Sequence, residues 1–185
     1  MGPHVCPWWG GYFIDNRLRR WLHNPERILA SYIQPGMTVL DFGCGMGMFS
    51  IALANLVGSQ GQVIAADLQP QMLDVLQRRA QRAGVAERIR PHRCQSDSMG
   101  LDPSIQSVQF ALAFYSAHEA LDLPRLLAEL HHCLCPGGRF LVVEPVGHVT
   151  ADDFAHMMEL ARQVGFRQLE RPRVRLSRAA VLEKI

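Results

Sequence analysis

Apolar residues recur along this chain in two spacings, which together predict alternating helices and strands. In four stretches they return every three or four positions, the spacing that places side chains on one face of a helix. Elsewhere they form short continuous runs bounded by glycine, proline or charged residues, as buried strands do. The helical stretches are Phe49–Leu56, Met72–Ala83, Leu123–Leu134 and Asp153–Val164.

The short apolar runs differ in ways that predict their places in a sheet. Phe140–Val143 is almost entirely apolar, as expected of a central strand covered on both faces. Arg88–Cys94 contains Pro91, which lacks a backbone donor, so this segment is expected at an edge. Near the end of the chain, Phe166–Arg171 and Val174–Leu182 are expected to pair as a hairpin. The remaining runs, Val39–Phe42, Gln62–Ala66 and Val108–Phe114, complete a doubly wound α/β sheet.

Residues 1–35 fall outside this alternation. Asn24, Pro25 and Glu26 are typical of a helix start, with asparagine as the N-cap and proline at the first position, and a short helix is expected through Ile33. The segment 6–13 is rich in aromatic residues and glycine. It suits a mobile flap over a pocket, although core packing explains it equally well. We therefore expect an N-terminal flap and helix in residues 1–35 and the main domain in residues 36–185.

Three alternating glycines, Gly43, Gly45 and Gly47, follow the first apolar run. Without a Cβ the backbone can turn sharply and let a ligand approach the peptide groups, and the next helix directs its unpaired amides there. A dinucleotide fingerprint requires glycine where Met48 stands. Asp41, just before the turn, would repel a pyrophosphate but suit a positively charged ligand. The turn therefore favours a cationic ligand over a dinucleotide.

At these residues the chain resembles the class I S-adenosylmethionine-dependent methyltransferases, whose first motif is an acidic residue, any residue, then G-x-G-x-G. Asp67 closes the next apolar run as in the second motif, Asp97 follows the third strand, and Pro136-Gly137-Gly138 precedes the fifth. The resemblance covers roughly Met37 to Glu170 and is closest to the branch with ubiquinone-biosynthesis and arsenite-type enzymes. It implies a mostly parallel seven-stranded sheet in the order 3-2-1-4-5-7-6, with strand 7 antiparallel.

The resemblance also implies S-adenosyl-L-methionine as the cofactor and a set of residues that bind it. The glycine turn, including Cys44, would surround the amino-acid portion, with Asp41 near its ammonium group. Asp67 would accept hydrogen bonds from the ribose hydroxyls, or else serve as a helix N-cap. Leu68 would pack on adenine. Asp97 and Ser98 would contact adenine as well, unless they form a plain turn. The full set is Asp41, Gly43, Cys44, Gly45, Gly47, Asp67, Leu68, Asp97 and Ser98.

His118, Glu144 and His148 are the candidates for contact with an acceptor, because each follows a strand and ligands bind at the carboxyl ends of strands. Imidazole takes a proton near neutral pH, which a reaction needs only if the acceptor loses one early. A carboxylate at the end of an apolar strand is costly without a partner. The alternatives are a histidine that caps the next helix and purely structural hydrogen bonds. With Glu119, these histidines fit no metal-binding motif, so no metal is expected.

Composition narrows the remaining classes. Of 185 residues, 48% are hydrophobic and 19% charged, which suits one folded domain and excludes a disordered chain. No run approaches the roughly 20 apolar residues that span a bilayer, and no secretory leader is recognisable, so we expect a cytoplasmic protein. The five cysteines form no C-x-x-C pair and are expected as reduced thiols. Five arginines, Arg167, Arg171, Arg173, Arg175 and Arg178, form either an anion-binding patch or a charged hairpin edge.

The sequence thus predicts methyl transfer from S-adenosyl-L-methionine to a small-molecule acceptor by in-line displacement. Nucleic acid is a disfavoured partner, and the oligomeric state is open, a homodimer being one arrangement. A first alternative is a cofactor-binding sensor or partner subunit without transferase activity. A second is a nicotinamide-dependent oxidoreductase, which Met48 and Asp41 both disfavour.

Overall fold

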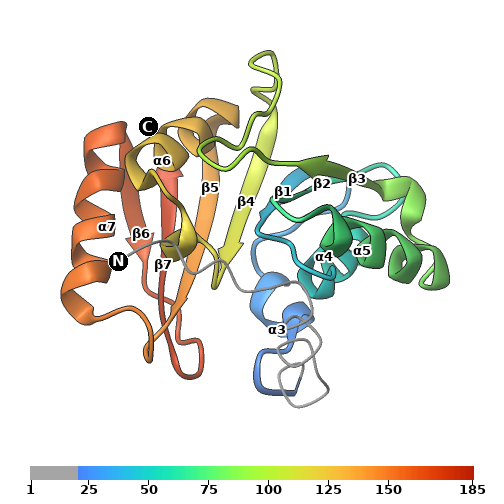
Figure 1. Ribbon diagram of the computed structural model, residues 1–185, viewed down its shortest axis with the longest axis horizontal. Coiled ribbons are helices and arrows are strands. Elements are labelled where there is room, and N and C mark those ends of the chain that lie inside the picture. Colours follow the sequence, from blue (N-terminus) through green and yellow to red (C-terminus); the bar gives the residue numbers. More distant parts are fainter. Residues whose placement is uncertain (1–20) are drawn as a thin grey trace.

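The computed structural model describes residues 21–185, which form one twisted sheet with helices on both faces (Figure 1). The aromatic segment 6–13 lies outside the described residues. The strands are β1 (Thr38–Phe42), β2 (Gln62–Asp67), β3 (Ile89–Arg93), β4 (Val108–Phe114), β5 (Leu134–Pro145), β6 (Phe166–Glu170) and β7 (Ser177–Lys184). The helices are α3 (Pro25–Leu29), α4 (Met48–Val57), α5 (Pro70–Arg82), α6 (Leu123–Cys133) and α7 (Ala151–Val164), with single 3-10 turns η2 (Ala86–Arg88) and η3 (Ala117–Glu119).

The seven strands lie in the order β3-β2-β1-β4-β5-β7-β6, which confirms the predicted topology. Neighbours among β1 to β5 are parallel, and β7 runs antiparallel to both β5 and β6. β3, which contains Pro91, is an edge strand as expected, and β6 with β7 is the predicted hairpin. From β1 the next strands are added toward one edge of the sheet, and from β4 they are added toward the other edge. A ligand crevice forms at such a switch point.

Two apolar layers hold the helices on the sheet. On one face, α3, α4 and α5 bury side chains such as Leu29, Leu53 and Leu76 against β1 and its neighbours. On the other face, α6 and α7 bury Leu127 and Phe154 in the same manner. Because both faces are covered, the central strands are apolar on both sides, and β4 and the second half of β5 are almost entirely buried.

From its proline and glycines, the sequence predicts that the turn Pro136-Gly137-Gly138 ends the preceding helix, and this prediction is wrong. α6 ends at Cys133 and β5 begins at once at Leu134. Between the pairs Val108–Leu134 and Phe110–Arg139, β4 advances two residues and β5 advances five, which leaves the tripeptide as a bulge. A Cβ on Gly138 would lie 2.8 Å from the carbonyl oxygen of Cys135, so glycine is needed at this approach.

Three other boundaries differ from expectation. α3 ends at Leu29 and not at Ile33, because the chain tightens into a turn in which Tyr32 N–H donates to the Leu29 carbonyl. α7 begins at Ala151, since Thr150 and Asp153 form a capping box that starts the helix two residues early. β7 begins at Ser177, after a loop in which Leu176 has a positive φ of 55°.

Within residues 21–185, none of the helices is both long and apolar enough to cross a bilayer. The proposed division of the chain at residue 35 stays a prediction, since the flap lies outside the described part. Leu29 and Ile33, which precede that boundary, are buried in the same apolar layer as α4.

Candidate cofactor and acceptor site

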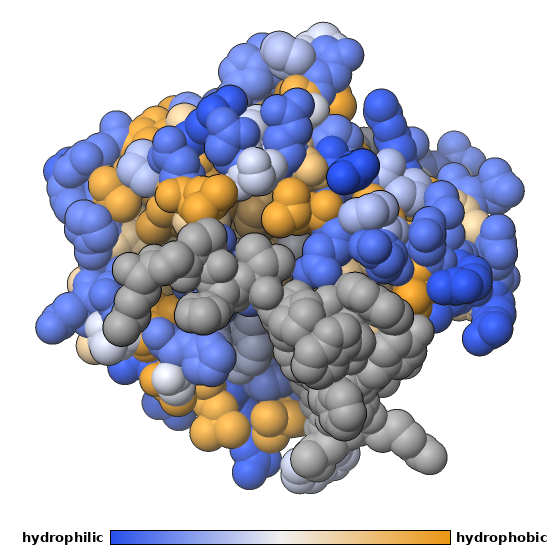
Figure 2. All heavy atoms as spheres, viewed as in Figure 1, coloured by the Kyte–Doolittle hydropathy of each residue, from blue (hydrophilic) through white to orange (hydrophobic). Residues whose placement is uncertain are grey.

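A cleft of about 440 Å³ opens at the carboxyl ends of the central strands. Two of the expected residues, Gly47 and Glu144, do not line it. In the view of Figure 2, hydrophobic side chains lie in several separate groups on a surface that is otherwise mostly hydrophilic. The expected residues that do line the cleft are Asp41, Gly43, Cys44, Gly45, Asp67, Leu68, Asp97, Ser98, His118 and His148.

The glycine turn is held against the neighbouring strand and loop. The backbone N–H groups of Gly43 and Cys44 both donate to the carbonyl oxygen of Ala66, at 2.8 and 3.1 Å. Gly43 has a φ of 67°, and a Cβ there would lie 2.3 Å from the Cβ of Ser116, in the loop after β4. The two loops at the switch point therefore touch only because residue 43 has no side chain.

Gly47 allows α4 and α5 to pack closely and does not line the cleft. It occupies the N-cap position of α4 with a φ of 88°, and a Cβ there would lie 2.8 Å from the Cγ of Leu76 on α5. No side chain caps α4, so the amides of its first turn keep the capacity to bind a ligand.

Asp67 joins the turn to the end of β2. One carboxylate oxygen accepts a hydrogen bond from Gly45 N–H at 2.8 Å, and the other accepts from Gln69 N–H at 2.9 Å. Gln69, not Asp67, is the N-cap residue of α5, so the N-cap alternative does not apply. Burial raises the pKa of Asp67, and the backbone donors oppose that rise. Each oxygen has a second lone pair, which leaves room for hydroxyl donors.

Replacing Asp67 with alanine is expected to weaken binding of S-adenosyl-L-methionine by about 1–3 kcal/mol, because hydrogen bonds to a charged acceptor are lost. Isothermal titration measures this directly. Asp74→Ala, an exposed change on α5, is the matched control and should leave affinity unchanged. Equal affinity in both variants would remove Asp67 from the cofactor site.

Asp41 is almost fully buried at the end of β1, and it lines the cleft. Its carboxylate accepts a hydrogen bond from the hydroxyl of Ser50 on α4 at 2.5 Å. Burial raises the pKa of Asp41 to about 7, although the Ser50 hydrogen bond opposes the rise and the charge of Asp67 adds to it. A cationic group in the cleft would favour the ionised form and lower that pKa again.

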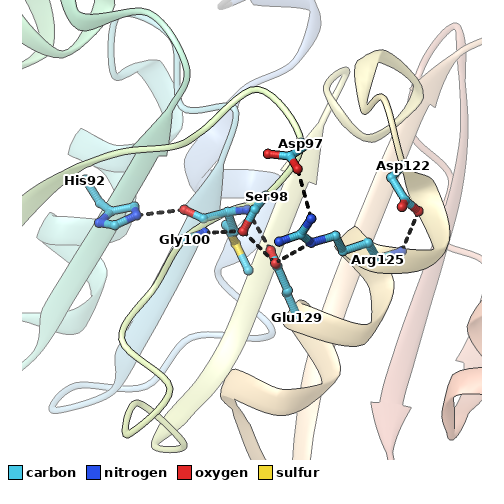
Figure 3. Close-up of polar contacts among 8 residues, drawn as sticks. His92, Asp97, Ser98, Gly100, Asp122, Arg125 and Glu129 are labelled. Atoms are coloured by element: carbon cyan, nitrogen blue, oxygen red, sulfur yellow. Dashed lines mark hydrogen bonds and ion pairs between the residues drawn. The ribbon is translucent and has the colours of Figure 1, made fainter.

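The loop that follows β3 is fastened to α6 by charged contacts (Figure 3). Asp97 forms an ion pair with Arg125 at 2.9 Å, and Ser98 donates its hydroxyl hydrogen bond to Glu129 at 2.7 Å. The second oxygen of Glu129 accepts from Met99 N–H at 2.6 Å. These contacts are structural, so contact of Asp97 and Ser98 with adenine stays a prediction. These partners could not be predicted from local patterns, because they lie about 30 residues further along the chain.

His118 and Glu144 form a hydrogen-bonded pair at the mouth of the sheet. Glu144 is fully buried beneath the histidine, where one oxygen accepts from the N–H groups of Ala117 and His118, at 3.0 and 3.3 Å. The other oxygen contacts the ring nitrogen Nδ1 of His118. The N-cap of α6 is Asp122, so His118 does not cap that helix. Glu144 thereby fixes which ring nitrogen, Nε2, is left to exchange protons.

The pKa of His118 lies above its ordinary value. Burial alone lowers it, but the hydrogen bond and the negative charge of Glu144, together with the charge of Glu119, outweigh the effect of burial. Glu119 lies in η3 and lines the cleft, four residues before α6 begins, so it is not at the start of that helix. The ring of His148 meets that of His118 edge-on, with centroids 6.0 Å apart.

Tyr115 is a site residue that the sequence did not reveal. It lines the cleft between β4 and η3 with a positive φ of 64°, which is unfavourable for a residue with a side chain. Its N–H donates to the carbonyl of Val143 at 2.8 Å, and its hydroxyl contacts that of Ser177 at 2.7 Å. These bonds hold the strained turn that brings His118 to the cleft.

Apolar side chains from several elements complete the walls. Sulfur-containing and aromatic residues dominate, and such side chains adapt to a flat or irregular ligand. The sulfur-containing and aromatic residues of the cleft are Phe42, Cys44, Met46, Met48, Phe49, Met72, Cys94, Met99, Phe114 and Tyr115. Leu121 and Leu126 add aliphatic surface.

The strand order, the glycine turn after β1 and the acid after β2 together define a class I S-adenosylmethionine-dependent methyltransferase. The chain belongs to that class: the family described as methyltransferase domain matches residues 39–138. The residues also fit the cofactor. The bare Gly43 backbone, the uncapped start of α4 and the spare lone pairs of Asp67 face a cleft of about 440 Å³, which suits a ligand of this size.

Two curated relatives fall in the quinone-biosynthesis branch. A 2-phytyl-1,4-naphtoquinone methyltransferase of Trichormus variabilis is 34% identical over 60% of this chain and 48% of its own. The ubiquinone/menaquinone biosynthesis C-methyltransferase UbiE of a Marinomonas species is 30% identical over 63% of this chain and 46% of its own. The chain thus spans about half the length of the curated relatives it matches. A crystal structure of a SAM-dependent methyltransferase from Aquifex aeolicus shares the fold, with a TM-score of 0.87 at 19% identity over 98% of this chain and all of that one.

Proposed function

We propose that this chain transfers the methyl group of S-adenosyl-L-methionine to a small aromatic acceptor that carries a ring hydroxyl. The observation that supports this most is the His118–Glu144 pair, which presents an oriented base to the same cleft as the glycine turn and Asp67. A base of this kind is needed when the acceptor must lose a proton to become nucleophilic.

The cofactor supplies a methyl group already activated by its sulfonium, so the protein contributes chiefly position and a dry site. In our proposal the turn from Gly43 to Gly47 holds the amino-acid portion, with Asp41 near its ammonium group. Asp67 accepts hydrogen bonds from the ribose hydroxyls and Leu68 packs on adenine. Asp97 and Ser98, fixed by α6, close the adenine end of the cleft.

In the acceptor half, Nε2 of His118 takes the proton of the ring hydroxyl. The electron pair of the resulting oxyanion is shared with the ring, and the oxygen or an adjacent ring carbon forms the new bond to the methyl carbon as the carbon–sulfur bond breaks. If the ring carbon attacks, it then loses its own proton and the ring becomes aromatic again. Glu144 supports this role because its negative charge stabilises the imidazolium ring that results. His148, edge-on to His118, contacts the acceptor or the proton on its way to solvent. The apolar walls suit a flat ring, and the two relatives are named for quinone substrates.

Transfer of radiolabelled methyl groups to a panel of acceptors tests the proposal. We expect incorporation into a reduced 1,4-naphthoquinone and not into the oxidised form, which has no hydroxyl proton to lose. Amines and thiols of similar size serve as comparisons. Cofactor binding without turnover on any acceptor would favour a sensor or partner subunit. Binding of a nicotinamide dinucleotide in place of S-adenosyl-L-methionine would contradict the proposal altogether.

The proposal also includes the location of the protein, its oligomeric state and the role of its N-terminal segment. A cytoplasmic location and a homodimer remain predictions, as does the N-terminal flap as a cover for the acceptor. Within residues 21–185, the four cysteines Cys44, Cys94, Cys133 and Cys135 are free thiols.

A further inference from the structure

A second cavity lies between the start of α7 and the loop that joins β6 to β7. Its volume is about 360 Å³, and among the described residues it shares no lining residue with the cofactor cleft. Three arginines, Arg171, Arg173 and Arg178, line it together with apolar side chains such as Phe154 and Val174. The arginine cavity therefore gathers three positive charges outside the proposed reaction site.

Within residues 21–185, none of these three arginines forms an ion pair. Arg171 makes one long hydrogen bond, 3.4 Å, to the side chain of Gln168. Other arginines nearby behave differently: Arg167 on β6 is paired with Glu183 at 2.5 Å, and Arg162 on α7 is paired with Glu159 at 2.7 Å. Among the described residues, the three arginines of the cavity therefore lack carboxylate partners, whereas Arg167 and Arg162 nearby have them.

Arg178 is the strongest evidence that the cavity binds a ligand with hydrogen-bond acceptors. Its Nη1 atom is buried and has no hydrogen-bond acceptor among the described residues. A guanidinium donor in that position is costly unless some group supplies an acceptor. The register places Arg178 opposite Glu144, but both oxygens of Glu144 are taken by the η3 turn and the His118 ring.

Two carboxylates whose sequence neighbours line the cavity are also engaged elsewhere. Asp153, in the first turn of α7, accepts hydrogen bonds from Thr150. Glu170, at the end of β6, accepts from the hydroxyl of Tyr32 at 2.9 Å. Neither of these two carboxylates forms an ion pair with an arginine of the cavity.

We propose that the arginine cavity binds a phosphate group. Planar guanidinium groups donate paired hydrogen bonds to the oxygens of a phosphate. One phosphate oxygen would be the acceptor that Nη1 of Arg178 lacks. The group that enters belongs either to a free phosphate ester or to the headgroup of an anionic phospholipid. The site lies outside the proposed methyl-transfer machinery, so it is independent of that function.

Titration of the full chain with inorganic phosphate and with pyrophosphate, at constant ionic strength, tests the site. Arginine side-chain ¹⁵N resonances report binding, and we expect Arg178 to shift most. The double variant R171Q/R173Q changes two exposed side chains and should weaken binding about tenfold or more. R167Q, which removes an arginine of the same hairpin with a carboxylate partner, is the matched control and should stay within about twofold of the parent.

A second arm identifies the source of the phosphate. Cosedimentation with phosphatidylglycerol vesicles, compared with phosphatidylcholine vesicles, tests binding of the headgroup. The variant R178Q tests the buried donor, and its melting curve shows whether the variant is still folded. Phosphate binding without vesicle binding supports a soluble ester, and vesicle binding that R171Q/R173Q removes supports the headgroup. Failure to bind either, or binding that R171Q/R173Q leaves unchanged, would overturn the proposal.

Discussion

Replacing His118 with glutamine is expected to lower kcat by about 10²–10³-fold, the usual contribution of a general base, while cofactor affinity stays close to that of the parent. Glutamine keeps a polar side chain of similar reach but cannot take a proton. Single-turnover rates with a saturating acceptor, together with titration of the cofactor, separate the two effects. His156→Gln, an exposed change on α7, is the control for loss of a histidine.

The pH dependence of kcat/KM in the variant Glu144→Gln also tests whether His118 is the general base. A base works in its neutral form, so kcat/KM should rise with pH through the pKa of His118. Because Glu144 raises that pKa against the effect of burial, the amide should let it fall, and the acidic limb should move to lower pH. The maximal rate should drop too, since the imidazolium loses its counter-charge.

Two results would contradict this assignment. If Glu144→Gln left the acidic limb in place, the titrating group would not be His118. If His118→Gln lowered affinity for the cofactor and turnover equally, the pair would serve the structure of the η3 turn, where Glu144 also accepts two backbone N–H groups. A melting curve of each variant distinguishes general loss of stability from loss of the base.

The sequence predicted the fold wherever one local signal determined the structure. Pro91 on an otherwise polar segment predicted the edge position of β3, and the apolar run around Leu141 predicted a buried central strand. The bulge at Pro136-Gly137-Gly138 could not be predicted in this way. Proline and glycine indicate a break in either case, and only the pairing of β4 with β5 decides that the break interrupts a strand.

In the candidate site, too, the residues with a local sequence pattern could be predicted, and those positioned by strand pairing could not. The glycine turn and Asp67 could be found because their spacing is fixed by one helix and one strand. The partner of His118 could not, since Glu144 lies 26 residues away and only parallel pairing of β4 and β5 brings the two together. The strained Tyr115 left no trace either, because a positive φ at tyrosine is imposed by tertiary contacts and not by residue type.

Gly43→Ala is expected to abolish measurable cofactor binding and to lower the free energy of unfolding by about 2–5 kcal/mol. Two costs combine. Alanine at a φ of 67° is strained, and its Cβ would lie 2.3 Å from the Cβ and 2.8 Å from the Oγ of Ser116. The loop after β4 must then move away, and it carries the Ser116 hydroxyl that donates to the Phe42 carbonyl at 2.8 Å.

Control and rescue variants separate those costs. Gly84→Ala has nearly the same φ, 70°, with no atom within 4 Å of the new Cβ, so it should show the backbone cost of about 1 kcal/mol with unchanged cofactor affinity. Adding Ser116→Gly to Gly43→Ala removes both close atoms and should restore part of the binding, whereas Ser116→Ala keeps the Cβ and should not. Titration with S-adenosyl-L-methionine and chemical denaturation measure both quantities. Equal recovery with alanine and glycine at residue 116 would mean that the serine hydroxyl, and not the close approach of two backbones, sets the shape of the turn.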